Sequence, residues 1–312
     1  MALPCIATKS DTAPDLQVRF ATTVKHPLQP ILESAVRNPV TGEFEWQDEQ
    51  GLTHVRYVDP LDGSQLEFVL HLTDNAIEIF WDGRVFIEDI PRVLLGTIFG
   101  RWLRAQDVTA LHANVVNIAG AAVLVCGGSG SGKSTTTAAL LAAGHPLLTD
   151  DLAALDLSGS SPKVRHGYPH LRLWPDSASG LGPEWQNLPL VFRNTETMGV
   201  KVYRDLAGHP ELFSDTDLPL SCVYVLDGRN EGLEQTQFER LPTGLAVPYL
   251  LRNLYLGQGR SSQLLAAYLP DMVHVAERCP VFLVRVAAGL NRLPELAAAM
   301  TAHARTVGNR QD

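Results

Sequence analysis

A glycine-rich octapeptide in the middle of the chain carries the clearest chemical signal. Residues 127–134 read Gly-Gly-Ser-Gly-Ser-Gly-Lys-Ser and satisfy the pattern G-x(4)-G-K-[ST], with a strand pattern before them and a helix pattern after them. Glycines allow successive backbone N–H groups to turn toward one anion, and the N-terminus of the following helix adds positive potential. The pattern therefore predicts a loop that binds the phosphates of a nucleoside triphosphate.

Two side chains of this loop have defined chemical roles. Lys133 is spaced to reach the β- and γ-phosphates, and the Ser134 hydroxyl is spaced to ligate magnesium. A glycine-rich turn that binds nothing is the alternative, and the complete pattern in its strand–helix context argues against it. The residues that we expect to surround the phosphates are Gly127, Gly128, Ser129, Gly130, Ser131, Gly132, Lys133, Ser134 and Thr135.

Two adjacent carboxylates follow the loop and its helix. Asp150 and Asp151 come after the short apolar strand Leu147–Thr149, at the kind of strand end where α/β sheets place ligand-contacting residues. Phosphoryl transfer to a hydroxyl requires magnesium, positive charge around the phosphoryl group, and a carboxylate that receives the hydroxyl proton. Adjacent aspartates often only cap a turn, but the position of this pair favours a functional role.

Basic and imidazole side chains elsewhere in the sequence could complete such a site. Arg172 and Lys201 are candidates for neutralising negative charge in a transition state, and Arg260 is a weaker third. The alternative for Arg172 and Lys201 is a solvated side chain at a strand edge. His112 lies one hairpin before the loop, where a histidine is either structural or part of the site.

Asp227 is a different candidate for a magnesium ligand. It follows the apolar strand Cys222–Leu226, as the acidic residue of ordinary phosphate-loop ATPases does. Because Asp-Gly pairs commonly form turns where strands end, we interpret Asp227-Gly228 as such a turn.

The elements that position these residues begin with a hairpin. Two apolar strands, Ala113–Ile118 and Ala121–Cys126, are joined by the tight turn Ala119-Gly120 and must run antiparallel. Most phosphate-loop enzymes place the strand before the loop inside a parallel sheet, so the hairpin predicts a mixed sheet. Gly144 ends the expected helix Lys133–Ala143, since a C′ position needs a positive φ. Other expected elements are strands at Val164–Arg165, His170–Trp174, Cys222–Leu226 and Val281–Val286, a surface turn at Leu157–Pro162, an irregular loop at Ser177–Asn194 and a final helix at Leu293–Ala304.

The first hundred residues have a different pattern. Leu66–Leu72 and Ala76–Trp81 alternate apolar and polar side chains between Asp-Gly turn signals, which is typical of β-hairpins. Pro91 then opens a helix that we expect over Arg92–Ala105. We therefore divide the chain into a smaller, mainly β N-terminal domain (1–105) and an α/β core (106–312).

The composition narrows the class of protein. A content of 45% hydrophobic and 19% charged residues is that of a globular protein, and a net charge of −9 argues against a general nucleic-acid binder. The four cysteines have neither CxxC nor zinc spacing and are expected to be reduced thiols. The N-terminus lacks a signal-peptide pattern, and no apolar run reaches the roughly 18 residues of a membrane span. We therefore expect a cytoplasmic protein without membrane attachment.

Three segments together resemble the catalytic core of the HPr kinase/phosphorylase family, whose nucleotide-binding core is related to that of phosphoenolpyruvate carboxykinases. They are Leu111–Val116 with its histidine, the Ser129–Ser134 loop, and Gly144–Asp151, which reads Gly-His-Pro-Leu-Leu-Thr-Asp-Asp. Tyr168–Asp176 is similar to HPr-kinase-related serine kinases found beside genes for ribosomally made peptides such as lasso peptides. The arginine- and glycine-rich C-terminal signature of true HPr kinases is not found.

The resemblance implies an HPr-kinase-like core with a mixed sheet and an enzyme that uses ATP and Mg²⁺. It implies that Asp150 is the base, that Asp151 is a magnesium or water ligand (or the reverse), and that His112 contacts the Asp150 carboxylate or the γ-phosphate. The expected acceptor is a serine-type hydroxyl of a peptide or small protein, docked by the N-terminal domain, and a homo-oligomer fits the family. Two alternatives stay open: a nucleotide-gated regulatory ATPase without an acceptor, and a kinase of a free small-molecule hydroxyl.

Overall fold

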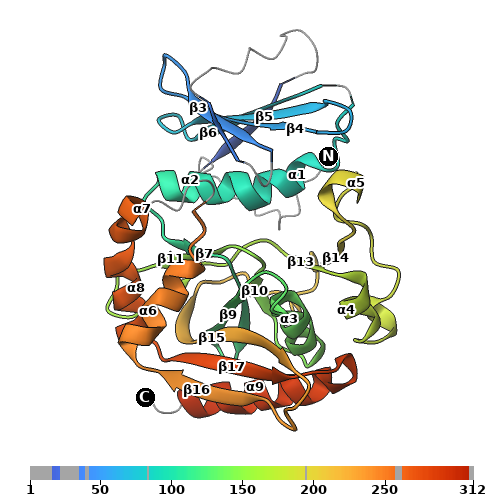
Figure 1. The fold of residues 1–312 in the computed structure, drawn as a ribbon, viewed down its shortest axis with the longest axis vertical. Helices are drawn as coiled ribbons and strands as arrows, with labels where there is room; N and C mark the ends of the chain where they lie inside the picture. The colour runs from blue at the N-terminus through green and yellow to red at the C-terminus, as the bar shows by residue number, and fades with distance from the viewer. Residues whose placement is uncertain are drawn as a thin grey trace. The chain divides into compact units, whose positions relative to one another are not determined.

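The computed structural model describes residues 16–21, 35–38, 42–82, 84–193, 195–256 and 262–308 (Figure 1). These residues form two compact units with separate cores. The first unit contains the described residues up to Gln106 together with Phe192–Val200, and the second contains Asp107–Val191 and the described residues from Lys201 onward. Each unit is described by itself.

The first unit contains a six-stranded sheet with one apolar face. All neighbouring strands are antiparallel except β1, which runs parallel to β6. Val55, Phe68, Ile77 and Ile79 are completely buried in its core. The predicted strands at 66–72 and 76–81 are confirmed to within one residue. The order across the sheet is β1 (Gln17–Phe20), β6 (Ala76–Trp81), β5 (Gln65–His71), β4 (Thr53–Val58), β3 (Phe44–Gln47) and β2 (Val36–Arg37).

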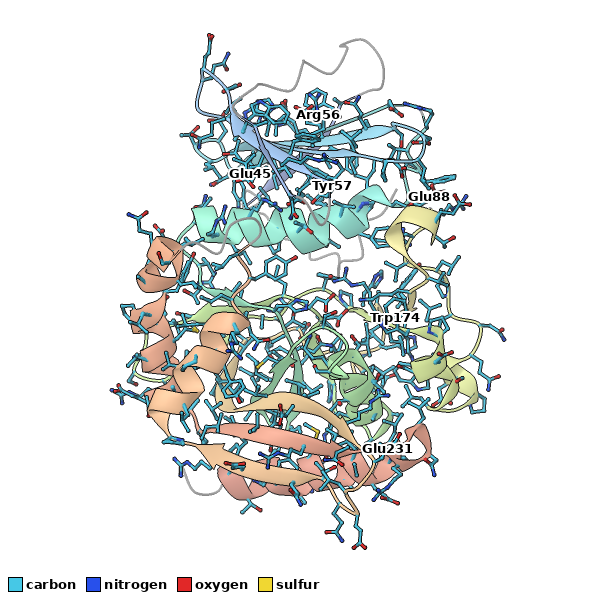
Figure 2. All side chains as sticks on the ribbon, in the orientation of Figure 1. Glu45, Arg56, Tyr57, Glu88, Trp174 and Glu231 are labelled. Carbon is cyan, nitrogen blue, oxygen red and sulfur yellow. The ribbon has the colours of Figure 1, made fainter. Side chains whose placement is uncertain are left out.

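One continuous helical segment of the first unit contacts this sheet. It consists of α1 (Ile90–Val93), a π-helical stretch (Leu94–Ile98) and α2 (Phe99–Ala105), so the predicted helix is confirmed and begins two residues early. Arg101 of α2 forms a buried ion pair with Glu43, just before β3, and a partly buried one with Glu45 of β3. Figure 2 shows Glu45 and Tyr57 between the strands and this helix. A short helix, α5 (Thr195–Met198), also belongs to this unit.

The second unit contains the predicted mixed sheet. β9 is antiparallel to β8 but parallel to β15, and β15 is in turn parallel to β17. The strands of this sheet are β7 (Ala110–Leu111), β8 (Ala113–Ile118), β9 (Ala121–Gly127), β10 (Leu147–Thr149), β11 (Ala153–Asp156), β12 (Lys163–Val164), β15 (Leu218–Asn230), β16 (Gln237–Leu241) and β17 (Val281–Ala287).

The hairpin between β8 and β9 has the predicted tight turn. Ala119 and Gly120 both have positive φ values, 56° and 85°. Two consecutive residues with positive φ are typical of the type I′ turn, whose twist matches that of an antiparallel pair. The strand that leads into the glycine loop, β9, is therefore the second strand of a hairpin and does not follow a crossover from a parallel strand.

Helices cover both faces of the central strands β9 and β15. Leu124 and Val223 pack on one side with α6 (Thr243–Arg252) and α8 (Leu269–Arg278). The alternate residues Val125 and Tyr224 pack on the other side with α3 (Lys133–Ala142) and α9 (Leu293–Gly308). Strand side chains alternate between faces, so these central strands are buried between two helical layers (Figure 1). The other helices of the unit are α4 (Pro175–Ser179), α7 (Ser262–Ala267) and the 3₁₀ turns Pro183–Trp185 and Leu290–Arg292.

A separate two-stranded ribbon adjoins α3. Its strands, β13 (His170–Leu173) and β14 (Val202–Asp205), are antiparallel. Leu171 and Leu173 are fully buried in a cluster that includes Ala138 and Leu141 of α3. Burial of this face fixes the ribbon beside the helix that begins at the glycine loop.

Two sequence predictions are wrong. The segment 177–194 is not simply irregular, because it contains the end of α4 and the turn Pro183–Trp185, and Trp185 is completely buried; Asn194 lies outside the described residues. Asp227-Gly228 is not a strand-end turn, because β15 continues past it and still pairs with β17 at Asn230. A bulge at this point absorbs the shift in register.

No helix among the described residues is long and apolar enough to span a membrane. Cys126, Cys222 and Cys279 are buried free thiols, as expected, and Cys5 lies outside the described residues.

Candidate active site

The glycine loop lies between the end of β9 and the start of α3. Gly127, Gly130 and Gly132 have φ values of 146°, 77° and 100°. A Cβ atom on Gly127 would lie 2.8 Å from the Leu226 carbonyl oxygen of β15. Only glycine fits this close approach, so the loop backbone is held against the neighbouring parallel strand. The result is a cradle of main-chain groups at a helix N-terminus, which suits an anion.

Lys133 lies inside this cradle. Its Nζ donates hydrogen bonds to the carbonyl oxygens of Gly127, at 2.9 Å, and Gly128, at 3.3 Å. Burial lowers the pKa of Lys133, although the charge of Asp151 opposes that shift. The hydroxyl of Ser131 is buried without a hydrogen-bond partner among the described residues. A charged donor and an unsatisfied hydroxyl both fit an anion in the loop.

The aspartate pair meets Arg172 of the ribbon. Asp150 follows β10, and its Oδ2 accepts hydrogen bonds from the backbone N–H of Arg172, at 3.0 Å, and from its Nε, at 3.3 Å. Nη2 of the same guanidinium lies 2.9 Å from Oδ2 of Asp151 and also donates to the Tyr168 hydroxyl. Asp150 is completely buried, and its Oδ1 has no hydrogen-bond partner among the described residues.

The two carboxyl groups have opposite pKa shifts. Burial, and next the negative charge of Asp151, raise the pKa of Asp150 to about 7. Burial acts in the same direction on Asp151, but the guanidinium of Arg172 and then the charge of His112 outweigh it and lower the pKa. One carboxyl group can therefore take up a proton near neutral pH while its neighbour stays ionised.

His112 contacts the main chain of the aspartate pair. Its Nδ1 lies 3.1 Å from the Asp151 carbonyl oxygen and not at the Asp150 carboxylate, and the alternative contact, with the γ-phosphate, remains a prediction. Asp151 adopts a left-handed conformation (φ 62°), and its N–H donates to Asn114 of β8. This conformation presents its carbonyl to the imidazole. Burial lowers the pKa of His112, which favours the neutral ring.

Lys201 lies just before β14. Its Nζ is 5.5 Å from the centroid of the Trp174 ring, and its charge lowers the pKa of both aspartates. The structure thus brings Lys201, Arg172 and His112 around the aspartate pair. Arg260 lies outside the described residues.

Sequence reasoning missed two residues that touch the glycine loop. Oδ1 of Asn253, after α6, accepts a hydrogen bond from the N–H of Gly127 at 3.0 Å. Nη2 of Arg229 donates to Thr135 at 3.3 Å, and the same guanidinium lies 3.6 Å from where a Cβ of Gly132 would be. No local motif marks Asn253. Arg229 was missed because β15 was expected to end at Leu226.

Asp227 is on the exposed side of β15. Its carboxylate lies 3.6 Å from Nε of Arg285 on β17. Thr135 of the loop helix instead bonds to Ser177 of α4, at 2.7 Å, and to Arg229. These contacts do not connect Asp227 with the glycine loop.

A magnesium site here would use few protein ligands. Within the described ranges, no three His, Cys, Asp or Glu side chains gather into a cluster that could hold a metal ion. Mg²⁺ usually keeps several waters and binds one or two carboxylates together with substrate phosphates. The half-buried hydroxyl of Ser134 and the ionised carboxylate of Asp151 fit that requirement.

The mixed sheet and the sequence of residues 127–134 place the chain in the class of α/β proteins that carry a phosphate-loop sequence. Its aspartate pair contacts Arg172. No protein-family model matches the chain. The chain is 29% identical to the HPr kinase/phosphorylase of Brevibacillus brevis over 141 residues, 41% of this chain and 45% of that protein. It is 31% identical to that of Caldanaerobacter subterraneus over 140 residues, 40% and 46% of the two chains. These matches make the chain a relative of the HPr kinase/phosphorylases.

The matched region spans less than half the length of these curated relatives. A shorter match to the enzyme of Clostridium botulinum has 41% identity over 69 residues, 20% of this chain and 23% of that protein. Among solved structures, the HPr(Ser) kinase/phosphatase from Coxiella burnetii matches with a TM-score of 0.33 and 15% identity, covering 63% of this chain and 96% of that one.

Proposed function

We propose that the protein is an ATP- and Mg²⁺-dependent kinase that transfers the γ-phosphoryl group to a serine-type hydroxyl of a peptide or small protein. The observation that carries the proposal is Asp150: a buried carboxyl with a raised pKa, an unpartnered oxygen, and an ionised neighbour that interacts with the loop lysine. Such a carboxyl suits proton abstraction at neutral pH.

In the proposed reaction, Oδ1 of Asp150 accepts the proton of the acceptor hydroxyl. The hydroxyl oxygen forms a bond to the γ-phosphorus, the bond to the β–γ bridging oxygen breaks, and ADP leaves with that electron pair. Arg172 holds Oδ2 of Asp150, which leaves Oδ1 for the acceptor. Lys133 exchanges its bonds to loop carbonyls for bonds to phosphate oxygens. Mg²⁺, held by Ser134 and Asp151, would neutralise charge on the phosphates.

The acceptor class is supported by the relatives, whose names describe kinases of the small protein HPr. We propose the same kind of acceptor for this chain, a polypeptide hydroxyl, with the β-rich N-terminal domain (1–105) docking it and the core (106–312) carrying the chemistry. The cytoplasm as location and a homo-oligomeric state belong to the same proposal.

Incubation with γ-labelled ATP tests this function. Label transferred to serine-containing peptides or small proteins of a broad panel, and lost in Asp150→Asn, would support it. Label found only in free phosphate would favour the regulatory ATPase. Label transferred only to amino acids or sugars would favour the small-molecule kinase.

A further inference from the structure

The β13–β14 ribbon has two chemically different faces. Leu171, Leu173 and Val202 are buried against the core beside α3. Side chains alternate along a strand, so the residues between them share the opposite face. That face carries His170, Arg172, Tyr203 and Asp205, and Trp174 and Lys201 lie directly beyond the two strands at one end of it.

The middle of this second face belongs to the candidate active site. Arg172 pairs across the ribbon with Tyr203 and donates two hydrogen bonds to Oδ2 of Asp150. Arg172 thus connects this face directly with the proposed proton acceptor. The ribbon is thus placed to contact whatever surrounds the reacting hydroxyl.

One end of the face offers an aromatic ring and a cation. Trp174 is 52% exposed, at the point where β13 ends and α4 begins (Figure 2). The Lys201 ammonium is 5.5 Å from the centre of this ring, and the Lys201 carbonyl is fixed by the N–H of Val191 at 2.8 Å. Within the described part of the chain, Lys201 has no carboxylate at ion-pair distance. Its charge is therefore open to an incoming anion.

The other end of the face carries an exposed carboxylate. His170 stacks on Tyr203 with ring centroids 4.7 Å apart, and its Nε2 lies 3.5 Å from the carboxylate of Asp205. The face thus has electrostatic polarity, with an open cation at the Trp174 end and a carboxylate at the His170 end. An extended segment lying along it would meet the Lys201 ammonium at one end and the Asp205 carboxylate at the other.

Resting on the proposed kinase function, we propose that Trp174 and Lys201 form an acceptor subsite for a peptide with an acidic side chain on one side of its serine. The acidic group pairs with the Lys201 ammonium, and the aliphatic part of that side chain packs on the exposed indole. Charge complementarity between the Lys201 ammonium beside Trp174 and an acidic side chain supports this occupant.

Peptide arrays with a central serine test this subsite. Each flanking position carries Asp, Asn or Lys in turn, and phosphorylation is measured with γ-labelled ATP. We expect a preference of about tenfold in kcat/KM for Asp over Asn on one side of the serine, expressed in KM. Lys201→Glu should reverse the preference toward Lys, and Trp174→Ala should weaken it. The matched charge reversal at exposed Lys163 of β12, Lys163→Glu, should leave the preference unchanged.

Three outcomes would overturn the subsite. One is phosphorylation without an acidic preference, and another is a preference that Lys201→Glu leaves intact. The third is a rise in the KM for ATP in Lys201→Glu with all peptides affected equally, which would put the ammonium on the phosphates. None of these contradicts the proposed kinase function.

A second array, with alanine in place of serine, separates this proposal from the proposed function. Binding of a fluorescent acidic peptide that needs Lys201 would support the subsite even if no peptide were phosphorylated. Absence of such binding in the wild-type protein overturns the subsite, whatever the result of the phosphorylation assay.

Discussion

Asp150 and Asp151 are neighbours in the sequence, but their pKa values are shifted in opposite directions. The main chain turns into a left-handed conformation at Asp151, so the first carboxyl points into a buried site and the second toward the cations around it. The raised pKa of one and the lowered pKa of the other divide the roles that phosphoryl transfer needs, a proton acceptor and an ionised ligand.

Asp150→Asn should lower kcat by about 10²–10⁴-fold, the range for loss of a general base, while ATP binding changes little. Steady-state kinetics and nucleotide titration measure the two effects. Asp227→Asn is the matched control, because its carboxylate faces Arg285 outside the glycine loop, and it should retain turnover. The opposite result, with Asp227 essential and Asp150 dispensable, would contradict the proposed mechanism.

The pH profile of kcat/KM should report the same carboxyl. Because the pKa of Asp150 is raised to about 7, the base is protonated below that pH, and the rate should fall about tenfold per pH unit on the acidic side. Arg172 lowers this pKa, so Arg172→Met should move the acidic limb to higher pH as well as reduce the rate. A limb near pH 4 in the wild type would contradict the raised pKa of Asp150.

At the scale of elements, the parallel contact between β9 and β15 shapes the glycine loop. Gly127→Ala should destabilise the second unit by about 1–3 kcal/mol, because the added Cβ would lie 2.8 Å from the Leu226 carbonyl and the residue has a positive φ. Gly128→Ala is the matched control: its Cβ would meet nothing within 4 Å, so stability should change by less than about 0.5 kcal/mol. Thermal or denaturant unfolding measures both variants.

The helix–sheet contact of the first unit depends on a buried guanidinium. Arg101→Met should cost about 3–5 kcal/mol, because it leaves Glu43 buried without its cation. Arg104→Met removes a more exposed partner, 3.8 Å from Glu45, and should cost less than about 1 kcal/mol. Equal effects in urea unfolding would contradict a dominant role for the buried pair.

At the scale of the whole molecule, two units with separate cores should respond differently to ligand. A nucleotide at 100 times its dissociation constant stabilises the state that binds it by about 2.7 kcal/mol. We expect ATP with Mg²⁺ to raise the melting temperature of the unit that contains the glycine loop, and Lys133→Ala to remove that rise in calorimetry. Arg101→Met should lower the transition of the first unit without removing the nucleotide effect.

Local sequence was sufficient for the parts of the site that are close in the chain. The β8–β9 hairpin, the glycine loop, α3 with Gly144, and Asp150-Asp151 follow one another directly, and each depends on turn chemistry or periodicity that short segments contain. The assignment of chemical roles to these residues remains a prediction. Buried Trp185, in a segment predicted to be irregular, shows that the same local signals fail where tertiary packing stabilises short turns.

Only the tertiary structure decided which distant residues contact the glycine loop and the aspartate pair. Asn253 reaches Gly127 across 126 residues, Arg229 reaches Thr135 across 94, and Arg172 reaches Asp150 across 22. Strand order, the bulge in β15 and burial of one ribbon face set these contacts, and none of these is encoded in a short pattern. The sequence by itself thus determined the loop and the aspartate pair, while packing determined the cations, the opposite pKa shifts and the face on which an acceptor could lie.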